Sequence, residues 1–129
     1  MANWDELIAF VRMRYEIMRQ GDGELWFNLP TTNGRSQIVA VRQVVGEDGH
    51  PWAQITSAIG RVEQIDLVKL LELAAEPVTG GVVAEGGLAL FRDAIPLDYT
   101  QLDGFEHPFR LVVAVADRLE RELTGADEG

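Results

Sequence analysis

The residues that could carry out chemistry are few, and they do not form a catalytic pattern. The 129-residue sequence has no cysteine and only two histidines, His50 and His107. A metal site usually draws its ligands from closely spaced pairs of such residues, whereas each histidine here stands alone beside a proline. We therefore interpret both as surface turn residues, and we predict neither a metal nor a cofactor.

The sequence also lacks the patterns of an activated nucleophile and of a phosphate-binding loop. Its serines, Ser36 and Ser57, lie in strand-like segments, and neither stands in the Gly-x-Ser-x-Gly turn that exposes a nucleophile. A phosphate-binding loop needs a lysine after its glycines, and the one lysine, Lys69, lies inside a predicted helix. We predict that the protein is not an enzyme.

The composition indicates a single acidic domain without a nucleic acid or membrane partner. Twenty-one acids against 11 bases give a formal net charge of −10, and such a field repels the phosphates of nucleic acids. No segment approaches the roughly 20 apolar residues of a membrane span, and the N-terminus lacks the basic leader of a secretory signal. We expect a cytoplasmic protein in which residues 1–129 form one domain, with 126–129 as a frayed tail.

Hydrophobic periodicity predicts an α+β domain, in which helices pack against an antiparallel sheet. The apolar residues of 3–19 have the spacing of one helical face, and Asn3 and Glu6 stand in capping-box positions. Two groups of strands have connections too short for parallel crossovers. The predicted order α-β-β-β-α-β-β-α comprises a helix over 3–19, strands over 24–29, 35–45 and 52–59, a helix over 65–76, strands over 81–85 and 88–97, and a helix over 108–123.

The first predicted helix carries a second apolar line, Phe10, Met13 and Ile17, away from its main apolar face. Methionine and aromatic residues on one line suit an adaptable binding surface, although the same line could pack under a loop or helix of its own chain. Trp26 lies opposite the apolar face of its strand, and a sheet covered on one side leaves its other face to water or to a partner. We predict that these four residues bind a partner protein.

The helix predicted over 65–76 is apolar around more than half of its circumference. Ile65, Val68 and Leu71 form one apolar stripe, which is widened by Leu67, Leu70, Leu73 and Ala74. Such a helix must be covered on two sides, and a domain of this size seldom provides both covers. The pattern predicts a second subunit.

The segment from Leu70 to Leu123 carries a similarity to a known family. It includes the helix LLELAAEP, the hairpin GGVVAEGGLALFRDAIPL and the closing helix AVADRLEREL. With these segments the chain resembles the type III secretion chaperone-like fold, and within that fold the YbjN family of sensory transduction regulators. The order of elements extends the resemblance over nearly the whole chain.

The resemblance implies a homodimer that binds protein clients. Such chaperones dimerise through the second helix and the neighbouring strand, and they bind extended client segments on apolar patches of the first helix and the sheet. By position, the client patch corresponds to Phe10, Met13 and Ile17. The dimer interface corresponds to Leu67, Leu70, Leu71, Leu73, Val82 and Val83.

We therefore expect a non-catalytic, dimeric module that binds a client or regulatory protein. Two other interpretations stay open. One is a small-ligand-binding or enzymatic domain with a pocket between sheet and helix, for which Arg42 and Arg92, each inside a strand, are the residues to inspect. The other is a structural subunit of a larger assembly.

Overall fold

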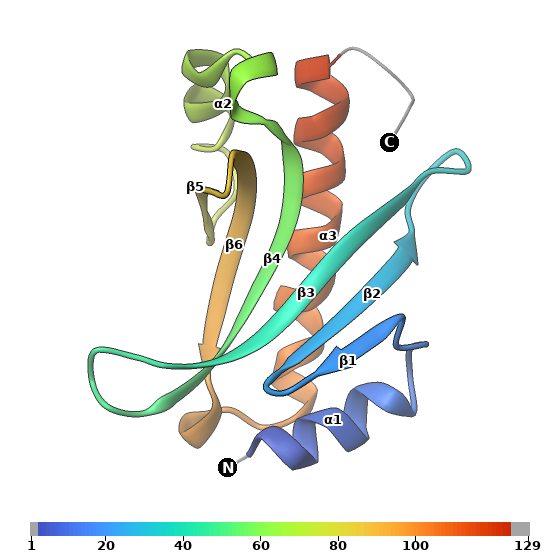
Figure 1. Cartoon of the computed structure of the whole chain (residues 1–129), viewed down its shortest axis with the longest axis vertical. Coiled ribbons are helices and arrows are strands. Elements are labelled where there is room, and N and C mark those ends of the chain that lie inside the picture. Colours follow the sequence, from blue (N-terminus) through green and yellow to red (C-terminus); the bar gives the residue numbers. More distant parts are fainter. Residues whose placement is uncertain (1–2, 125–129) are drawn as a thin grey trace.

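The computed structural model of the chain describes residues 3–124 as one antiparallel sheet with a long helix along one face (Figure 1). The helices are α1 (Trp4–Arg12), α2 (Leu67–Leu73) and α3 (Asp103–Thr124), with short 3-10 turns η1 (Val62–Gln64) and η2 (Leu97–Tyr99). The strands are β1 (Arg19–Gly21), β2 (Glu24–Pro30), β3 (Ser36–Val45), β4 (Pro51–Arg61), β5 (Gly81–Glu85) and β6 (Leu88–Pro96). The predicted α+β class is confirmed, with one additional short strand.

The six strands lie in the order β1-β2-β3-β4-β6-β5, and every neighbouring pair is antiparallel. Because side chains alternate between the faces of a strand, this register places one row of apolar residues towards α3 and a second row away from it. The covered face holds the buried residues Leu25, Phe27, Val39, Val41, Ala53, Ile55, Phe91 and Ile95. No helix of residues 3–124 covers the other face (Figure 1), which is called the open face below.

Aromatic rings join α3 to the sheet at the centre of the core. The ring centroid of Phe109 in α3 lies 5.1 Å from that of Phe27 in β2, in an edge-on arrangement. It lies 5.2 Å from the ring centroid of Phe105, in a stacked arrangement. Phe27, Phe105 and Phe109 are all fully buried. Edge-on and offset ring pairs contribute about 0.5–1.5 kcal/mol each beyond their buried area, so this cluster fixes where α3 crosses the sheet.

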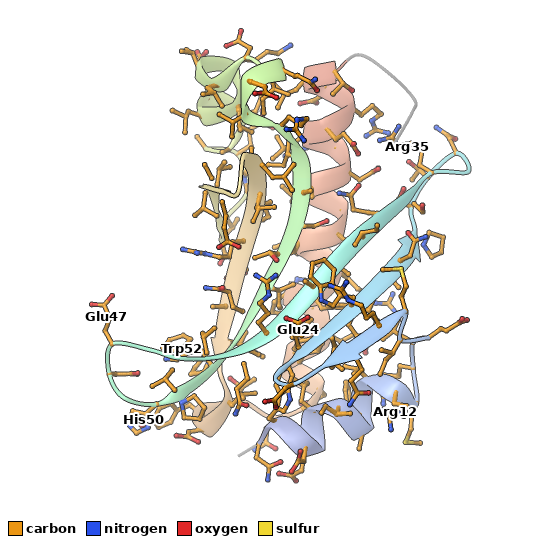
Figure 2. The ribbon with its side chains drawn as sticks, in the orientation of Figure 1. Arg12, Glu24, Arg35, Glu47, His50 and Trp52 are labelled. Atoms are coloured by element: carbon orange, nitrogen blue, oxygen red, sulfur yellow. The ribbon has the colours of Figure 1, made fainter. Side chains whose placement is uncertain are left out.

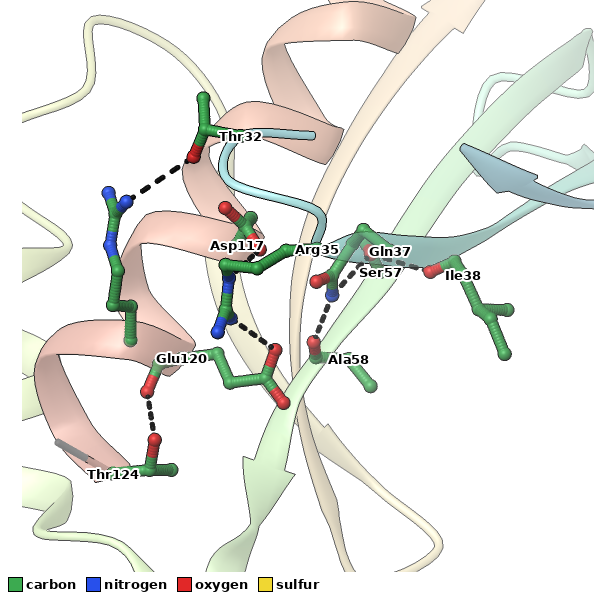
Figure 3. A network of polar contacts seen from close by, with 10 residues as sticks. Thr32, Arg35, Gln37, Ile38, Ser57, Ala58, Asp117, Glu120 and Thr124 are labelled. Carbon is green, nitrogen blue, oxygen red and sulfur yellow. Dashed lines mark hydrogen bonds and ion pairs between the residues drawn. The ribbon is translucent and has the colours of Figure 1, made fainter. Parts of the chain in front are cut away.

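A buried ion pair holds the start of β3 against the C-terminal half of α3 (Figure 3). Arg35 Nε donates to Asp117 Oδ1 over 3.0 Å, and its Nη2 lies 3.4 Å from Glu120 Oε1. The side chains of Arg35 and Asp117 are only 3% and 5% exposed. Burying two charges is costly unless they are paired and hydrogen-bonded, and this pairing meets that condition.

The first helix is shorter than predicted, and the strand β1 was missed. The capping box of Asn3 and Glu6 is confirmed, but α1 ends at Arg12 and not near residue 19. The chain leaves the helix because the Tyr15 ring packs against both Phe27 and Phe109, with ring centroids 6.3 and 5.1 Å away. Tertiary packing thus overrides a helical pattern that was continuous in the sequence.

The other two helices also differ from their predicted bounds. The structure begins α3 at Asp103, five residues before the predicted start, so that Pro108 and His107 lie inside the helix. Burial of Phe105 favours this added first turn despite the proline. By contrast, α2 covers only Leu67–Leu73 of the predicted 65–76. It starts at Leu67 because Asp66 caps the helix by accepting a hydrogen bond from the Lys69 backbone. The predicted tail at 126–129 lies outside the described residues.

Candidate binding surfaces

The predicted line of Phe10, Met13 and Ile17 is not a single stripe in the structure. Because α1 ends at Arg12, Met13 is the residue that caps the helix and Ile17 lies beyond it. Met13 is 85% exposed, whereas Phe10 and Ile17 are half-buried and pack against the core. The Arg14 guanidinium also covers the Phe10 ring at 3.9 Å. Of the three, Met13 is therefore the residue most available to a partner.

Trp26 lies on the open face within a row of residues that crosses the sheet. The register aligns it with Ala40, Thr56 and Arg92 on successive strands. Its indole Nε1 donates to Glu24 Oε1 over 3.0 Å. The guanidinium groups of Arg19 and Arg42 lie 4.6 and 5.5 Å from the centre of its ring. Trp26 is half-buried, so charged neighbours hold its ring on a face that no helix covers.

The open face is concave. Arg42 of β3 lies 3.3 Å from Glu85 of β5, although two strands separate them in the sheet order. In a flat sheet these backbones would lie about 14 Å apart across the strands. They would also lie about 20 Å apart along them, because Arg42 is in register with Ala94 of β6 and Glu85 with Leu88. Side chains could not span that distance, so the sheet bends towards this face. A hollow of about 290 Å³ results, and Arg42 lies at its edge, half-buried and paired with Glu24 and Glu85. Its other lining residues include Trp26, Ile38, Ala40, Thr56, Ala58, Leu88 and Leu90.

The surface predicted for self-association lies on α2 and the edge strand β5. Leu67 and Leu71 are exposed, Leu71 by 66%, and Leu73, Val82 and Val83 are half-buried. Leu70 is only 1% exposed and belongs to the core of its own chain. The predicted interface did not include Val68 or Val78, which are 69% and fully exposed. We call Leu67, Val68 and Leu71 the outer side of α2.

A larger hollow of about 750 Å³ lies on the helix side of the sheet, between α3 and the end of β2. We call it the α3 cleft. A pocket between sheet and helix was one of the interpretations left open, but its lining residues were not predicted, because its walls come from segments far apart in the chain. It is lined by Tyr15, Leu29, Pro30, Thr31, Thr32, Arg110, Leu111, Val113, Ala114, Val115, Asp117, Arg118 and Arg121.

A polar triad closes one end of the α3 cleft. The Tyr15 hydroxyl donates to Glu106 Oε2 over 2.6 Å and accepts from Arg110 Nε over 3.0 Å. Burial, followed by the neighbouring Glu106, raises the pKa of Tyr15 above its usual value of 10.0. The tyrosine hydrogen bond lowers the pKa of Glu106, because it stabilises the carboxylate form. This triad ties the segment after α1 to α3.

The residues inspected for chemistry lie apart from one another. His50 lies in the β3–β4 turn, and its Nδ1 is 2.9 Å from Oδ2 of Asp98 in η2. His107 is exposed on α3. Ser57 donates its hydroxyl to the Ile38 carbonyl over 2.6 Å and accepts from Gln37 (Figure 3). Within residues 3–124, no group of three or more histidine, aspartate and glutamate side chains could hold a metal ion. No helix in that range is both long and apolar enough to cross a bilayer.

The β3–β4 turn is held by its own side chains. Figure 2 shows Glu47, His50 and Trp52 gathered around this projecting turn. Asp48 accepts hydrogen bonds from the His50 backbone over 3.0 Å and from Trp52 Nε1 over 3.2 Å. These bonds, the backbone one foremost, lower the pKa of Asp48. The contacts explain the turn's shape, and they provide no reactive group.

Comparison with known proteins identifies the fold. No protein-family model matches the chain, and no curated protein sequence matches it. Its structure is similar to a chain in the solved structure of the HopA1–SchA chaperone–effector complex, with a TM-score of 0.57 over 93% of this chain and 91% of that one. The two chains share 14% sequence identity. The protein therefore has the secretion chaperone-like α+β fold.

Proposed function

We propose that the protein is a non-catalytic, dimeric module that binds a segment of another protein. The observation that carries this proposal is the apolar surface that a single chain leaves exposed, above all the outer side of α2. The fold adds support, because the similar structure is that of a chaperone bound to an effector. A cytoplasmic location and a role like that of the YbjN-type regulators are part of the same proposal.

Self-association through α2 would remove the exposed leucines and valine from water. Leu67, Val68 and Leu71 stand on three of five successive positions and are exposed, and the helix that carries them lies at one end of the molecule (Figure 1). Fully burying one such side chain contributes about 1.5–3 kcal/mol, and a twofold axis would use each residue twice. Leu73, Val82 and Val83, which are half-buried, would flank this contact. Leu70 would support the helix from inside.

The client surface in this proposal is the concave open face around Trp26, with Met13 as a second contact. Tryptophan rings are frequent anchors of protein interfaces, because they bury a large area with little loss of side-chain entropy. The arginines and glutamates around Trp26 would form a polar rim of the kind that surrounds interface anchors. Phe10 and Ile17 would serve mainly as support within the chain.

Light scattering coupled to size-exclusion chromatography tests the dimer. At micromolar concentration the wild type should elute with twice the chain mass of 14.3 kDa. Leu71→Asp should elute as a folded monomer, because the residue is exposed in the single chain and an unpaired charge in an interface costs several kcal/mol. Arg61→Asp, at an exposed position on another element, is the matched control and should remain dimeric. A monomeric wild type would contradict the proposal.

A further inference from the structure

The α3 cleft has mainly apolar walls, and its charged groups all come from α3. Leu29 and Pro30 form one wall, and Leu111 and Ala114 line the helix side. Its volume of about 750 Å³ falls within the usual range of pockets for small molecules. The cleft thus combines a hydrophobic interior with a few polar groups, as ligand pockets do.

Three arginines, Arg110, Arg118 and Arg121, line the cleft along α3. At 1.5 Å of rise per residue they span about 16 Å of the helix. The cleft's one acidic lining residue, Asp117, is already paired with Arg35 at 3.0 Å. Arg110 pairs with Glu106 at 3.2 Å, so the basic part of the cleft lies around Arg118 and Arg121, although the whole chain carries a net charge of −10.

Hydrogen bonds cross the cleft at both ends. At one end Arg110 Nε donates to the Tyr15 hydroxyl over 3.0 Å, and at the other Arg121 Nη1 lies 3.5 Å from Thr32 Oγ1. Each bond joins α3 to the opposite wall. A long polypeptide could not pass through without breaking these bonds, so the geometry favours a ligand short enough to lie between them.

Arg118 lies between the two closed ends and makes no ion pair with any residue of 3–124 described by the structure. Its Nε is buried and has no hydrogen-bond partner there, and the same holds for the Thr31 hydroxyl on the opposite wall. Buried polar groups nearly always have partners. Both groups can donate hydrogen bonds, so the missing partner is a hydrogen-bond acceptor. Small rotations of the Arg118 and Thr31 side chains would bring both donors within reach of an acceptor in the cleft.

We propose that the α3 cleft binds a free aliphatic carboxylate. Arg118 would hold the carboxylate, with Thr31 and Arg121 nearby, and the aliphatic chain would lie along Ala114 and Leu111 towards Tyr15. The eight residues from Arg118 to Arg110 provide about 12 Å of cleft, which suits a chain of medium length. Charge complementarity selects the carboxylate, and the apolar walls select the chain. This site is separate from both surfaces of the proposed protein-binding function.

The acidic character of the whole chain does not oppose such a site. At physiological salt the Debye length is about 8 Å, so most of the distant carboxylates are screened while the adjacent guanidinium groups are not. Added salt should also weaken the attraction at Arg118. The affinity of a carboxylate should therefore fall with ionic strength, and that of an uncharged analogue should not.

Isothermal titration of the full chain with dodecanoate, below the concentration at which it forms micelles, tests the proposal. We expect saturable binding at one site per chain, with dodecanol at least tenfold weaker because it lacks the charge. Amide chemical shifts should change at Thr31, Ala114 and Arg118. Absence of saturable binding would overturn the proposal, and so would equal affinity for dodecanol or shifts centred on the outer side of α2.

Variants separate the site from general detergent-like binding. Arg118→Gln should weaken dodecanoate roughly tenfold or more, since a hydrogen bond to a charged group has that magnitude, while dodecanol should be unaffected. Ala114→Trp should block both ligands by filling the cleft, and it tests the site if the arginine variant does not fold. Arg61→Gln is the surface control and should bind like the wild type. Unchanged binding by folded Arg118→Gln and Ala114→Trp, or binding of an acidic peptide in the cleft when dodecanoate does not bind, would overturn the assignment.

Discussion

Two adjacent leucines of α2 should respond oppositely to the same substitution. Leu70 is 1% exposed and Leu71 is 66% exposed, yet both belong to one short helix. Replacing a buried leucine by alanine costs about 2–5 kcal/mol of folding free energy, whereas exposed substitutions usually change it by less than about 0.5 kcal/mol. Leu70→Ala should therefore destabilise each chain, and Leu71→Ala should not.

The effect on assembly should be reversed. Covering the exposed two-thirds of Leu71 would contribute about 1–2 kcal/mol per chain, from the range for full burial. Twofold symmetry doubles this to about 2–4 kcal/mol, so Leu71→Ala should raise the dimer dissociation constant by roughly thirtyfold or more. Leu70→Ala affects the dimer only through its loss of folded protein.

Urea denaturation of both variants and sedimentation equilibrium over a range of concentrations measure the two effects. For each variant, denaturation should be carried out at a concentration where the wild type is mainly monomeric, so that dimer dissociation does not contribute to unfolding. Two results would refute the reasoning: a Leu71→Ala dimer as tight as that of the wild type, or a Leu70→Ala chain as stable as the wild type. The first would move the interface away from α2, and the second would contradict the burial of Leu70.

Two further predictions concern polar contacts of α3. Asp117→Asn removes the carboxylate that faces the buried Arg35 and should cost about 3 kcal/mol or more in urea denaturation; an unchanged midpoint would mean that the ion pair does not stabilise the fold. Tyr15→Phe removes the hydrogen bond that lowers the pKa of Glu106, so an NMR titration should find that pKa raised. A lowered pKa of Glu106 stabilises the folded state at any pH above the pKa of this group in the unfolded chain, and the gain is lost as the pH falls through the folded-state pKa. The difference in stability between wild type and Tyr15→Phe should therefore shrink in acid.

Local patterns predicted most of the fold because the residues that define each element are buried on one side. The β-branched alternation of β3 and the capping pair at Asn3 and Glu6 are of this kind. The strand β1 has no such pattern, since Arg19, Gln20 and Gly21 are all exposed and only pairing with β2 makes them a strand. The end of α1 depends on Tyr15 reaching Phe109, a contact between distant segments.

The candidate surfaces were predictable only in part. The width of the apolar stripe on α2 indicated that two sides needed cover, but periodicity could not decide whether Leu70 or Leu71 faces the core. Met13 and Ile17 were assigned to one helical line because the early end of α1 could not be foreseen. The α3 cleft required the fold itself, because α3 supplies its arginines and β2 supplies its opposite wall.

The protein is proposed to bind another protein through its open face, with Met13 as a second contact. Affinity purification of the tagged full chain from the organism that produces it, followed by mass spectrometry, tests this most directly when wild type and a Met13→Ser, Trp26→Ala double variant are compared. We expect one partner in stoichiometric amount with the wild type. We also expect loss of that partner with the variant, whose own dimer mass stays unchanged. Recovery of no partner by the wild type, or equal recovery by both chains, would contradict the proposal.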